Sequence, residues 1–178
     1  MSFDEEWFPE ASQWALSELG RSTAGLEGRV IEIGCWQGRS TVALANAVWP
    51  CDVEAVDTWQ GSPGEESEVL ARGRDVLSEF RTNVAELTKG NINVHAADWR
   101  AYRYTDSTPV RLLHIDGEHT YVEVYDTIRS FLPLMVAGGI ICGDDAHHDP
   151  VIRAVTEVLG TVRLWATLWI WEKADGDN

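Results

Sequence analysis

The sequence predicts an α/β fold: a doubly wound, mostly parallel sheet of seven strands with helices on both faces and an antiparallel hairpin at the carboxyl end. Five short apolar segments alternate along the chain with segments of helical periodicity. The apolar segments are nearly continuous, as in parallel strands that are buried on both faces. The last segment, TVRLWATLWIWEK, predicts two strands joined by a short turn near Ala166 and Thr167.

Strands and helices follow each other in a regular order. The expected strands before the hairpin are 29–33, 52–56, 91–95, 110–115 and 138–142. The expected helices are 4–19, 41–48, 65–87 with a break near Gly73, 119–132 and 150–159. Asp149 followed by Pro150 is a typical start for the last helix. We expect the first helix, within residues 1–20, to pack on the sheet beside the site, and residues 174–178 to be a disordered tail.

Composition limits the possible functions. A chain of 178 residues with 44% hydrophobic and 24% charged residues is typical of one globular domain spanning residues 1–178. The formal net charge of -15 argues against binding to nucleic acid or to an anionic membrane surface. The sequence has neither a basic signal segment nor an apolar run of roughly 20 residues, so we expect a cytoplasmic protein. We interpret Cys35, Cys51 and Cys142 as buried free thiols.

The stretch RLLHIDGEHTY, residues 111–121, carries the clearest chemical signal. Its apolar strand ends at Asp116, turns at Gly117 and presents His119 at the start of a helical pattern. Ligands of open α/β sheets bind at the carboxyl ends of the strands. A carboxylate and an imidazole at this edge therefore indicate a functional site, with helix capping by Asp116 as the structural alternative.

A glycine-rich loop follows the first strand. It reads EIGCWQGRS, and its glycines allow the backbone to approach a ligand before a helix begins. Trp36 replaces the second glycine of the dinucleotide fingerprint, and the loop has no Lys for a phosphate-binding loop. The loop therefore suits a nucleoside without phosphates. Asp57, after the second strand, is placed to accept both ribose hydroxyls.

These motifs together resemble a known family. VIEIGCWQGRST, AVDTW, AADWR, LLHIDGEHTY and GGIICGDD occur in this order over most of the chain. They are similar to the motifs of class I S-adenosylmethionine-dependent methyltransferases, in the branch of sugar and macrolide O-methyltransferases and cephalosporin-hydroxylase-like proteins known as methyltransferase family 24. The resemblance implies a Rossmann-like fold and S-adenosylmethionine as cofactor.

The resemblance also implies roles for particular residues. The methionine part of the cofactor would lie against Glu32, Gly34, Gly38 and Ser40, its ribose against Asp57 beside Thr58, and its adenine against Asp98 and Trp99, with Asp116 facing both cofactor and substrate. A divalent cation, Mg²⁺ or Mn²⁺, would be held by Asp116, Asp144 and Asp145. His119 would be the general base.

Physical chemistry supports this metal set independently. Three carboxylates at neighbouring strand ends repel one another unless a cation neutralises them, and an all-oxygen set suits Mg²⁺ or Mn²⁺. The alternative places Asp144 and Asp145 in loop and capping positions. Several further side chains have both a structural and a functional interpretation: His147 and His148 as a solvated loop, His95 and His114 as core, Trp36 and Trp59 as packing or cofactor walls, and Arg100, Arg103 and Tyr104 as substrate contacts.

The sequence as a whole predicts a metal-dependent O-methyltransferase acting on a hydroxyl of a small molecule such as a sugar, polyketide or phenol. One alternative is a cephalosporin-hydroxylase-like metal-binding protein, although His119, His148 and Asp116 are poorly spaced for an iron site. Another is a non-catalytic protein that binds S-adenosylmethionine or a nucleoside. The segments 61–74 and 102–109, or a second subunit of a homodimer, would cover the substrate.

Overall fold

The computed structural model describes residues 3–4, 6–103 and 107–174. Tyr104 and, apart from residue 174, the tail predicted at 174–178 lie outside the described residues.

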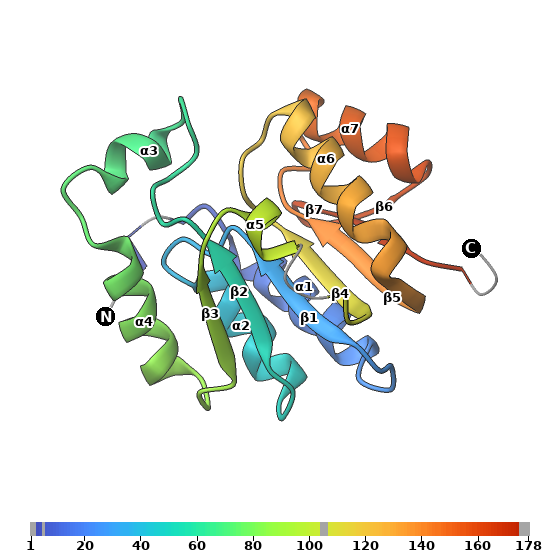
Figure 1. Cartoon of the computed structure of the whole chain (residues 1–178), viewed down its shortest axis with the longest axis horizontal. Helices are drawn as coiled ribbons and strands as arrows, with labels where there is room; N and C mark the ends of the chain where they lie inside the picture. The colour runs from blue at the N-terminus through green and yellow to red at the C-terminus, as the bar shows by residue number, and fades with distance from the viewer. Residues whose placement is uncertain (1–2, 5, 104–106, 175–178) are drawn as a thin grey trace.

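A seven-stranded sheet forms the centre of the molecule (Figure 1). Its strands are β1 (Arg29–Ile33), β2 (Val53–Asp57), β3 (Ile92–Ala96), β4 (Val110–Ile115), β5 (Met135–Gly143), β6 (Arg163–Trp165) and β7 (Leu168–Glu172). Their spatial order is β3-β2-β1-β4-β5-β7-β6. The first five strands pair in parallel, and β7 runs antiparallel between β5 and β6. The predicted fold class, including the terminal hairpin, is confirmed.

Helices cover both faces of this sheet (Figure 1). They are α1 (Glu10–Ser22), α2 (Arg39–Val48), α3 (Glu66–Ala71), α4 (Val76–Leu87), α5 (Trp99–Arg103), α6 (Tyr121–Phe131), the 3-10 helix η1 (Leu132–Leu134) and α7 (Asp149–Leu159). Helices α1, α2 and α4 lie on one face, and α5, α6 and α7 on the other. Helix α3 lies beyond the carboxyl ends of the strands, over the edge where ligands bind in such sheets.

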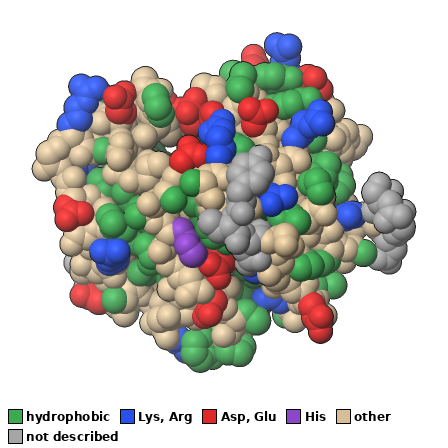
Figure 2. All heavy atoms as spheres, in the orientation of Figure 1, with side chains coloured by type: hydrophobic (Ala, Val, Ile, Leu, Met, Phe, Trp, Pro, Cys, Tyr) green, Lys and Arg blue, Asp and Glu red, His purple; other side chains and the backbone are tan. Residues whose placement is uncertain are grey.

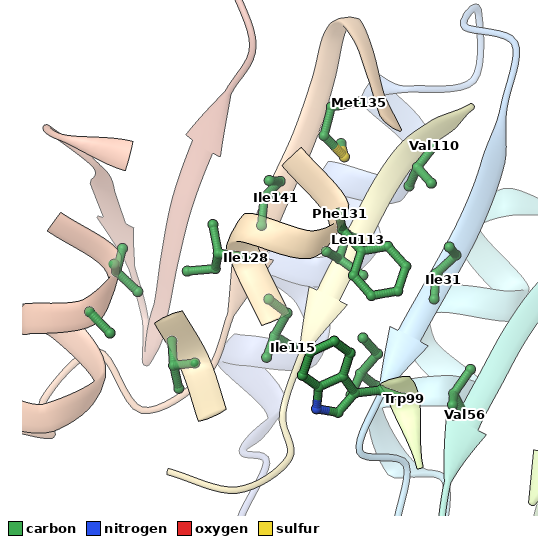
Figure 3. Close-up of a cluster of buried hydrophobic side chains, with 14 of the residues drawn as sticks. Ile31, Val56, Trp99, Val110, Leu113, Ile115, Ile128, Phe131, Met135 and Ile141 are labelled. Atoms are coloured by element: carbon green, nitrogen blue, oxygen red, sulfur yellow. The ribbon is translucent and has the colours of Figure 1, made fainter. Parts of the chain in front are cut away.

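The strands alternate their side chains between two apolar layers. Ile31, Leu113 and Ile141 lie on the face of the sheet that α6 covers, as Figure 3 shows, whereas their neighbours Val30 and Leu112 face α1 and α2. This alternation follows from the two-residue period of a strand. Because both faces are buried, the strands read as continuous apolar runs in the sequence.

The first helix begins six residues later than predicted. It starts at Glu10, directly after Pro9, whose φ and ψ are extended. A proline restricts the residue before it to extended conformations, so the apolar pattern of residues 4–8 does not continue the helix. Trp7 and Phe8 are instead placed against the cleft described below. The helix itself packs on α2 and the sheet, as expected.

The middle of the chain shows one confirmed prediction and two differences. The predicted break at Gly73 is confirmed: α3 ends before it, α4 begins after it, and its φ of 83° is left-handed. Helix α5 is not predicted by the sequence, because its five residues are too few for a helical pattern and AADWR follows a strand directly. Cys51 is exposed rather than buried, since it lies in the turn between α2 and β2, while Cys35 and Cys142 are buried as expected.

The strand register brings the predicted functional positions to one edge. Ile33 is opposite both Val56 and Ile115, and Ile115 is opposite Gly143. The residues that follow these four positions therefore leave the sheet side by side. On the face shown in Figure 2, Lys and Arg side chains are scattered among acidic and apolar ones. Among the residues that the structure describes, no helix is both long and apolar enough to span a membrane.

Candidate functional site

A large cleft of about 1310 Å³ lies at the carboxyl ends of β1, β2, β4 and β5. Seven of the predicted cofactor residues line it: Gly34, Ser40, Asp57, Thr58, Asp98, Trp99 and Asp116. The predicted base His119 and the predicted metal ligands Asp144 and Asp145 line the same cleft. Glu32 and Gly38 do not line it. The strand order reverses at β1 and β4, so the cleft lies at the topological switch point of the sheet.

The glycine loop after β1 is shaped by two close approaches. Gly34 has a φ of 84°, and a Cβ atom there would lie 2.1 Å from the backbone oxygen of Asp116. Only glycine allows β1 and β4 to release their loops this close together. Gly38, with a φ of 91°, precedes α2 and packs against Phe80 of α4. Gly34 thus allows the β1 and β4 loops to meet at the cleft, and Gly38 allows the start of α2 to pack closely on α4.

Asp57 holds this loop in place. Its Oδ2 accepts hydrogen bonds from the backbone N–H groups of Cys35 (2.7 Å) and Trp36 (2.9 Å), and its Oδ1 accepts one from Trp59 (2.7 Å). A carboxylate has about four acceptor positions, so about one remains, on Oδ1. Asp57 therefore has about one free acceptor position toward the cleft, and its contact with both ribose hydroxyls stays a prediction.

The far end of the cleft is built by α5 and α6. The indole Nε1 of Trp99 donates to Glu123 (3.1 Å), and Arg100, which stacks on Trp99, forms an ion pair with the same carboxylate at 2.5 Å. Asp98 accepts from the backbone N–H of Arg100 (2.7 Å). Glu123 therefore fixes the aromatic face of Trp99. Arg100 lines the cleft, whereas Arg103 donates to the backbone of Ser130 and does not line it.

Two tryptophans singled out in the sequence have different positions. Trp36 lines the cleft and contacts Trp7, with 5.6 Å between ring centroids. Trp59 is buried against Phe80 and donates its Nε1–H to the backbone oxygen of Trp36 (2.9 Å). Trp36 is therefore a wall of the cleft and Trp59 a packing residue.

The chemical centre of the cleft is a group formed by Asp116, His119 and Asp145. Their nearest ligand atoms all lie within 4.8 Å of one another. His119 Nε2 is 2.8 Å from Asp145 Oδ2. This contact is an ion pair and not a well-aligned hydrogen bond, since Nε2 is among the buried polar atoms without a hydrogen-bond partner. The structure thus brings together two of the three predicted metal ligands and the predicted base.

The electrostatics of this group reflect crowded negative charge. Burial, and then the charge of Asp144, raise the pKa of Asp116 to about 7. Burial by itself would lower the pKa of His119. The contact with Asp145 and the negative charges of Asp145, Glu65 and Asp116 outweigh this effect and raise the pKa of His119 to about 9. Burial likewise raises the pKa of Asp145, but His119 outweighs it and the net shift is downward. His119 and Asp145 are therefore both charged at neutral pH.

Asp144 differs from its neighbour. Burial raises its pKa, against a hydrogen bond from Thr167 that lowers it. It belongs to none of the groups of close ligand atoms found among the described residues. Its Oδ1 is buried without a hydrogen-bond partner. A buried carboxylate oxygen without a partner is costly and favours a cation or a proton nearby.

Glu65 is a site residue that the sequence analysis did not identify. Its carboxylate accepts the backbone N–H of His119 (3.2 Å) and contacts the ring Nδ1 (3.0 Å). Glu65 directly precedes α3, in the segment 61–74 that was expected to cover the substrate, and several residues of this segment line the cleft. The long sequence separation from His119 hides this pairing, because no local pattern connects the two residues. The second expected cover, 102–109, is described only in part, and its Tyr102 is buried in the core.

Glu32 and His114 form a buried pair beneath the site. Both side chains have no exposed surface, and His114 Nδ1 is 3.0 Å from Glu32 Oε1. The other Glu32 oxygen accepts the hydroxyl of Thr41 at the start of α2. Burial disfavours a charged His114, but the carboxylate of Glu32 outweighs it and raises the pKa. Glu32 therefore ties β1 to β4 and α2 from within the core. His95 in turn pairs with Glu54 across β3 and β2 (2.6 Å).

The same fold occurs in solved O-methyltransferases. The O-methyltransferase NovP matches 92% of this chain and 79% of its own with a TM-score of 0.72 and 20% identity. The calicheamicin methyltransferase CalS11 matches 94% and 82% with a TM-score of 0.68 and 14% identity. TomG from Streptomyces achromogenes, solved in complex with SAM, matches 92% and 79% with a TM-score of 0.67 and 15% identity. The fold is therefore that of the class I methyltransferases.

The family is shown by the sequence itself. The model of methyltransferase family 24, described as a methyltransferase domain, matches residues 31–146. The chain belongs to this family, which confirms the resemblance seen in the motifs. A curated relative, the uncharacterized protein y4gI of Sinorhizobium fredii (strain NBRC 101917 / NGR234), is 24% identical over 144 residues, which cover 79% of this chain. The matched region spans only 15% of that relative's length.

Proposed function

We propose that the chain transfers a methyl group from S-adenosylmethionine to a hydroxyl group of a small molecule, with a divalent metal ion at the acceptor. The observation that carries this proposal is the position of Asp116, His119 and Asp145 in the same cleft as the glycine loop. Family membership supports methyl transfer, and the SAM bound in TomG supports the cofactor.

The cofactor is proposed to lie along the first two strands. Gly34 and Ser40 would face its methionine part, and Asp57 with Thr58 its ribose. The adenine would lie near Asp98, against the indole of Trp99. Glu32, which is buried and outside the cleft lining, would act indirectly by holding the strand from which the loop leaves.

The acidic residues fit a divalent cation. Asp116 and Asp145 have ligand atoms within 4.8 Å of each other, and Asp144 adds a buried oxygen without a partner. The upward shifts in the pKa of Asp116 and Asp144 are the response expected of carboxylates that lack a compensating charge. Asp116 and Asp145 would hold Mg²⁺ or Mn²⁺, with Asp144 beside them. Such an ion lowers the pKa of a bound hydroxyl group.

His119 is proposed to take the hydroxyl proton. The charges of Asp145, Glu65 and Asp116 keep His119 protonated when no cation compensates them. With a divalent cation among these carboxylates, that attraction falls and the pKa of His119 returns toward its ordinary value of about 6.5. Glu65 keeps the ring oriented by accepting from Nδ1, which leaves Nε2, the nitrogen beside Asp145, as the proposed proton acceptor.

In the transfer step, His119 Nε2 would take the proton of the acceptor hydroxyl. Bound S-adenosylmethionine would supply the methyl group, so that a carbon–oxygen bond forms as the carbon–sulfur bond breaks and a neutral thioether leaves. Catalysis is mainly positioning and charge stabilisation, which a rigid strand edge supplies.

The test combines binding and turnover. Transfer of a labelled methyl group to a panel of sugars, polyketides and phenols should require added Mg²⁺ or Mn²⁺ and stop with EDTA. We expect Asp116→Asn and Asp145→Asn to lower the rate by about 100-fold or more. Asp52→Asn, an exposed carboxylate near the opposite end of β2, is the matched control. Calorimetric binding of S-adenosylmethionine without any methyl transfer would instead favour a non-catalytic binding protein, and activity unchanged by EDTA would exclude the metal role.

A further inference from the structure

Asp145 presents its two carboxylate oxygens to different imidazoles. Oδ2 is 2.8 Å from His119 Nε2, on the side of Asp116. Oδ1 is 3.7 Å from His147 Nε2 and 3.9 Å from His148 Nε2. The ligand atoms of Asp145, His147 and His148 all lie within 4.8 Å of one another. A second group of potential ligands thus shares Asp145 with the group already described.

The backbone holds this second group together. Asp145 has a left-handed φ of 59°, which reverses the chain after β5. The N–H of His148 donates to the backbone oxygen of Asp145 (2.9 Å), and His148 directly precedes α7. This turn brings both imidazoles back over the carboxylate. The two rings meet edge to face, with centroids 4.6 Å apart.

The distances are close to those of a metal site. Tetrahedral bonds of about 2.0–2.1 Å place neighbouring ligand atoms roughly 3.3 Å apart. The two separations from Asp145 Oδ1, 3.7 and 3.9 Å, exceed this value by only about 0.4–0.6 Å. The side chains of His147 and His148 are 66% and 47% exposed, so small rotations of these rings can close the gap.

We propose that Asp145, His147 and His148 form a second cation site at the mouth of the cleft, selective for an imidazole-binding transition metal ion such as Zn²⁺. Two imidazole nitrogens and one carboxylate oxygen suit Zn²⁺, Co²⁺ or Ni²⁺, whereas Mg²⁺ prefers oxygen ligands. Three protein ligands leave a fourth position open for a small ligand, as in catalytic zinc sites. His147 and His148 line the cleft, so this position faces it. The proposal does not depend on methyl transfer.

The test measures metal binding directly. Tag-free protein is stripped of metal and titrated with Zn²⁺ by calorimetry in excess Mg²⁺, and Co²⁺ is added to a parallel sample to record its visible absorption. We compare the unmodified protein with the double variant His147→Gln/His148→Gln. His95→Gln is the matched control, because His95 of β3 pairs with Glu54 of β2 and lies outside the cleft lining.

We expect the unmodified protein and His95→Gln to bind Zn²⁺ in excess Mg²⁺ and to give an imidazole-type Co²⁺ spectrum. The double variant should bind Zn²⁺ at least about 100-fold more weakly, beyond the 10–100-fold that loss of a supporting residue costs. Unchanged Zn²⁺ affinity in the double variant, or displacement of Zn²⁺ by Mg²⁺ in the unmodified protein, would overturn the proposal. Loss of methyl transfer with intact Zn²⁺ binding would overturn only the function proposed above.

Discussion

His119 is held by a carboxylate on each side of its ring. Glu65 contacts Nδ1 at 3.0 Å, and Asp145 contacts Nε2 at 2.8 Å. An imidazole bonded in this way has a fixed orientation, which a proton acceptor needs. The two carboxylates also compete with that role, because they stabilise the protonated ring. The chemistry of this one residue therefore depends on how much of the nearby negative charge is compensated.

We predict that Glu65→Gln slows methyl transfer by about 10–100-fold, part of the full contribution of a general base. The amide still reaches Nδ1 but no longer fixes the ring with a charge. The free energy of unfolding should change little, since the amide keeps the shape of the side chain and its oxygen can still accept from Nδ1. Turnover and urea denaturation measure the two effects. Glu68→Gln serves as control, because it removes a surface ion pair with Arg72 while the amide oxygen can still accept from the backbone N–H of Gly64. Equal rates for both variants would contradict the positioning role of Glu65.

The loop between β1 and α2 depends on contacts from three other elements. Asp57 of β2 accepts two of its N–H groups, Asp116 after β4 approaches Gly34, and Phe80 of α4 packs behind Gly38. These contacts all come from the chain itself, so the fold holds the loop and the cleft that it lines.

We predict that Gly34→Ala abolishes cofactor binding. The added Cβ would lie 2.1 Å from a backbone oxygen, so the β1 and β4 loops must separate. We expect a loss of about 3 kcal/mol or more in the free energy of unfolding. Gly90→Ala is the control, because Gly90 has a similar φ of 81° but open space around it, which leaves only about 1–2 kcal/mol of backbone strain. Calorimetry with S-adenosylmethionine separates the two, and normal binding by Gly34→Ala would refute the close-approach argument.

At the scale of the whole molecule, the fold concentrates negative charge at one edge of the sheet. Asp116 and Asp144 leave adjacent strands at the same level. Burial and the charge of Asp144 raise the pKa of Asp116, and burial and the charge of Asp145 raise the pKa of Asp144. Neighbouring buried carboxylates lower the free energy of unfolding, and such a cost is typical of a functional site. Removing one of these charges should therefore stabilise the metal-free protein while removing the proposed activity.

We predict that Asp116→Asn raises the free energy of unfolding of the metal-free protein at pH 8 by about 1–3 kcal/mol. For a fully buried group, a pKa raised from 3.8 to about 7 would correspond to roughly 4 kcal/mol, so this is the upper bound. The pKa of Asp116 is higher in the folded than in the unfolded state, so the free energy of unfolding of the unmodified protein falls as the pH rises from about 4 to 7. The gain should therefore shrink at pH 5. Urea denaturation in EDTA at both pH values tests this sign. A gain that grows toward pH 5 would contradict it.

Much of the fold followed from local signals in the sequence. Apolar runs marked the first five strands to within a few residues, Gly73 marked the break between α3 and α4, and the Ala166–Thr167 turn marked the hairpin. The strand ends also identified Asp57, Asp116 and Asp145 as cleft residues. These features can be predicted because strand burial and turn conformation depend on only a few neighbouring residues of the sequence.

Other features were decided only by tertiary structure. The pairing of Glu65 with His119 joins residues 54 positions apart. The burial of Glu32 with His114 depends on strand register, and the separation of Asp144 from the Asp116–His119–Asp145 group depends on the left-handed turn at Asp145. The sequence by itself determined which residues reach the carboxyl edge of the sheet, since that follows from local strand patterns. Only the packed structure decided which of them touch, because those contacts depend on how distant loops meet above the sheet.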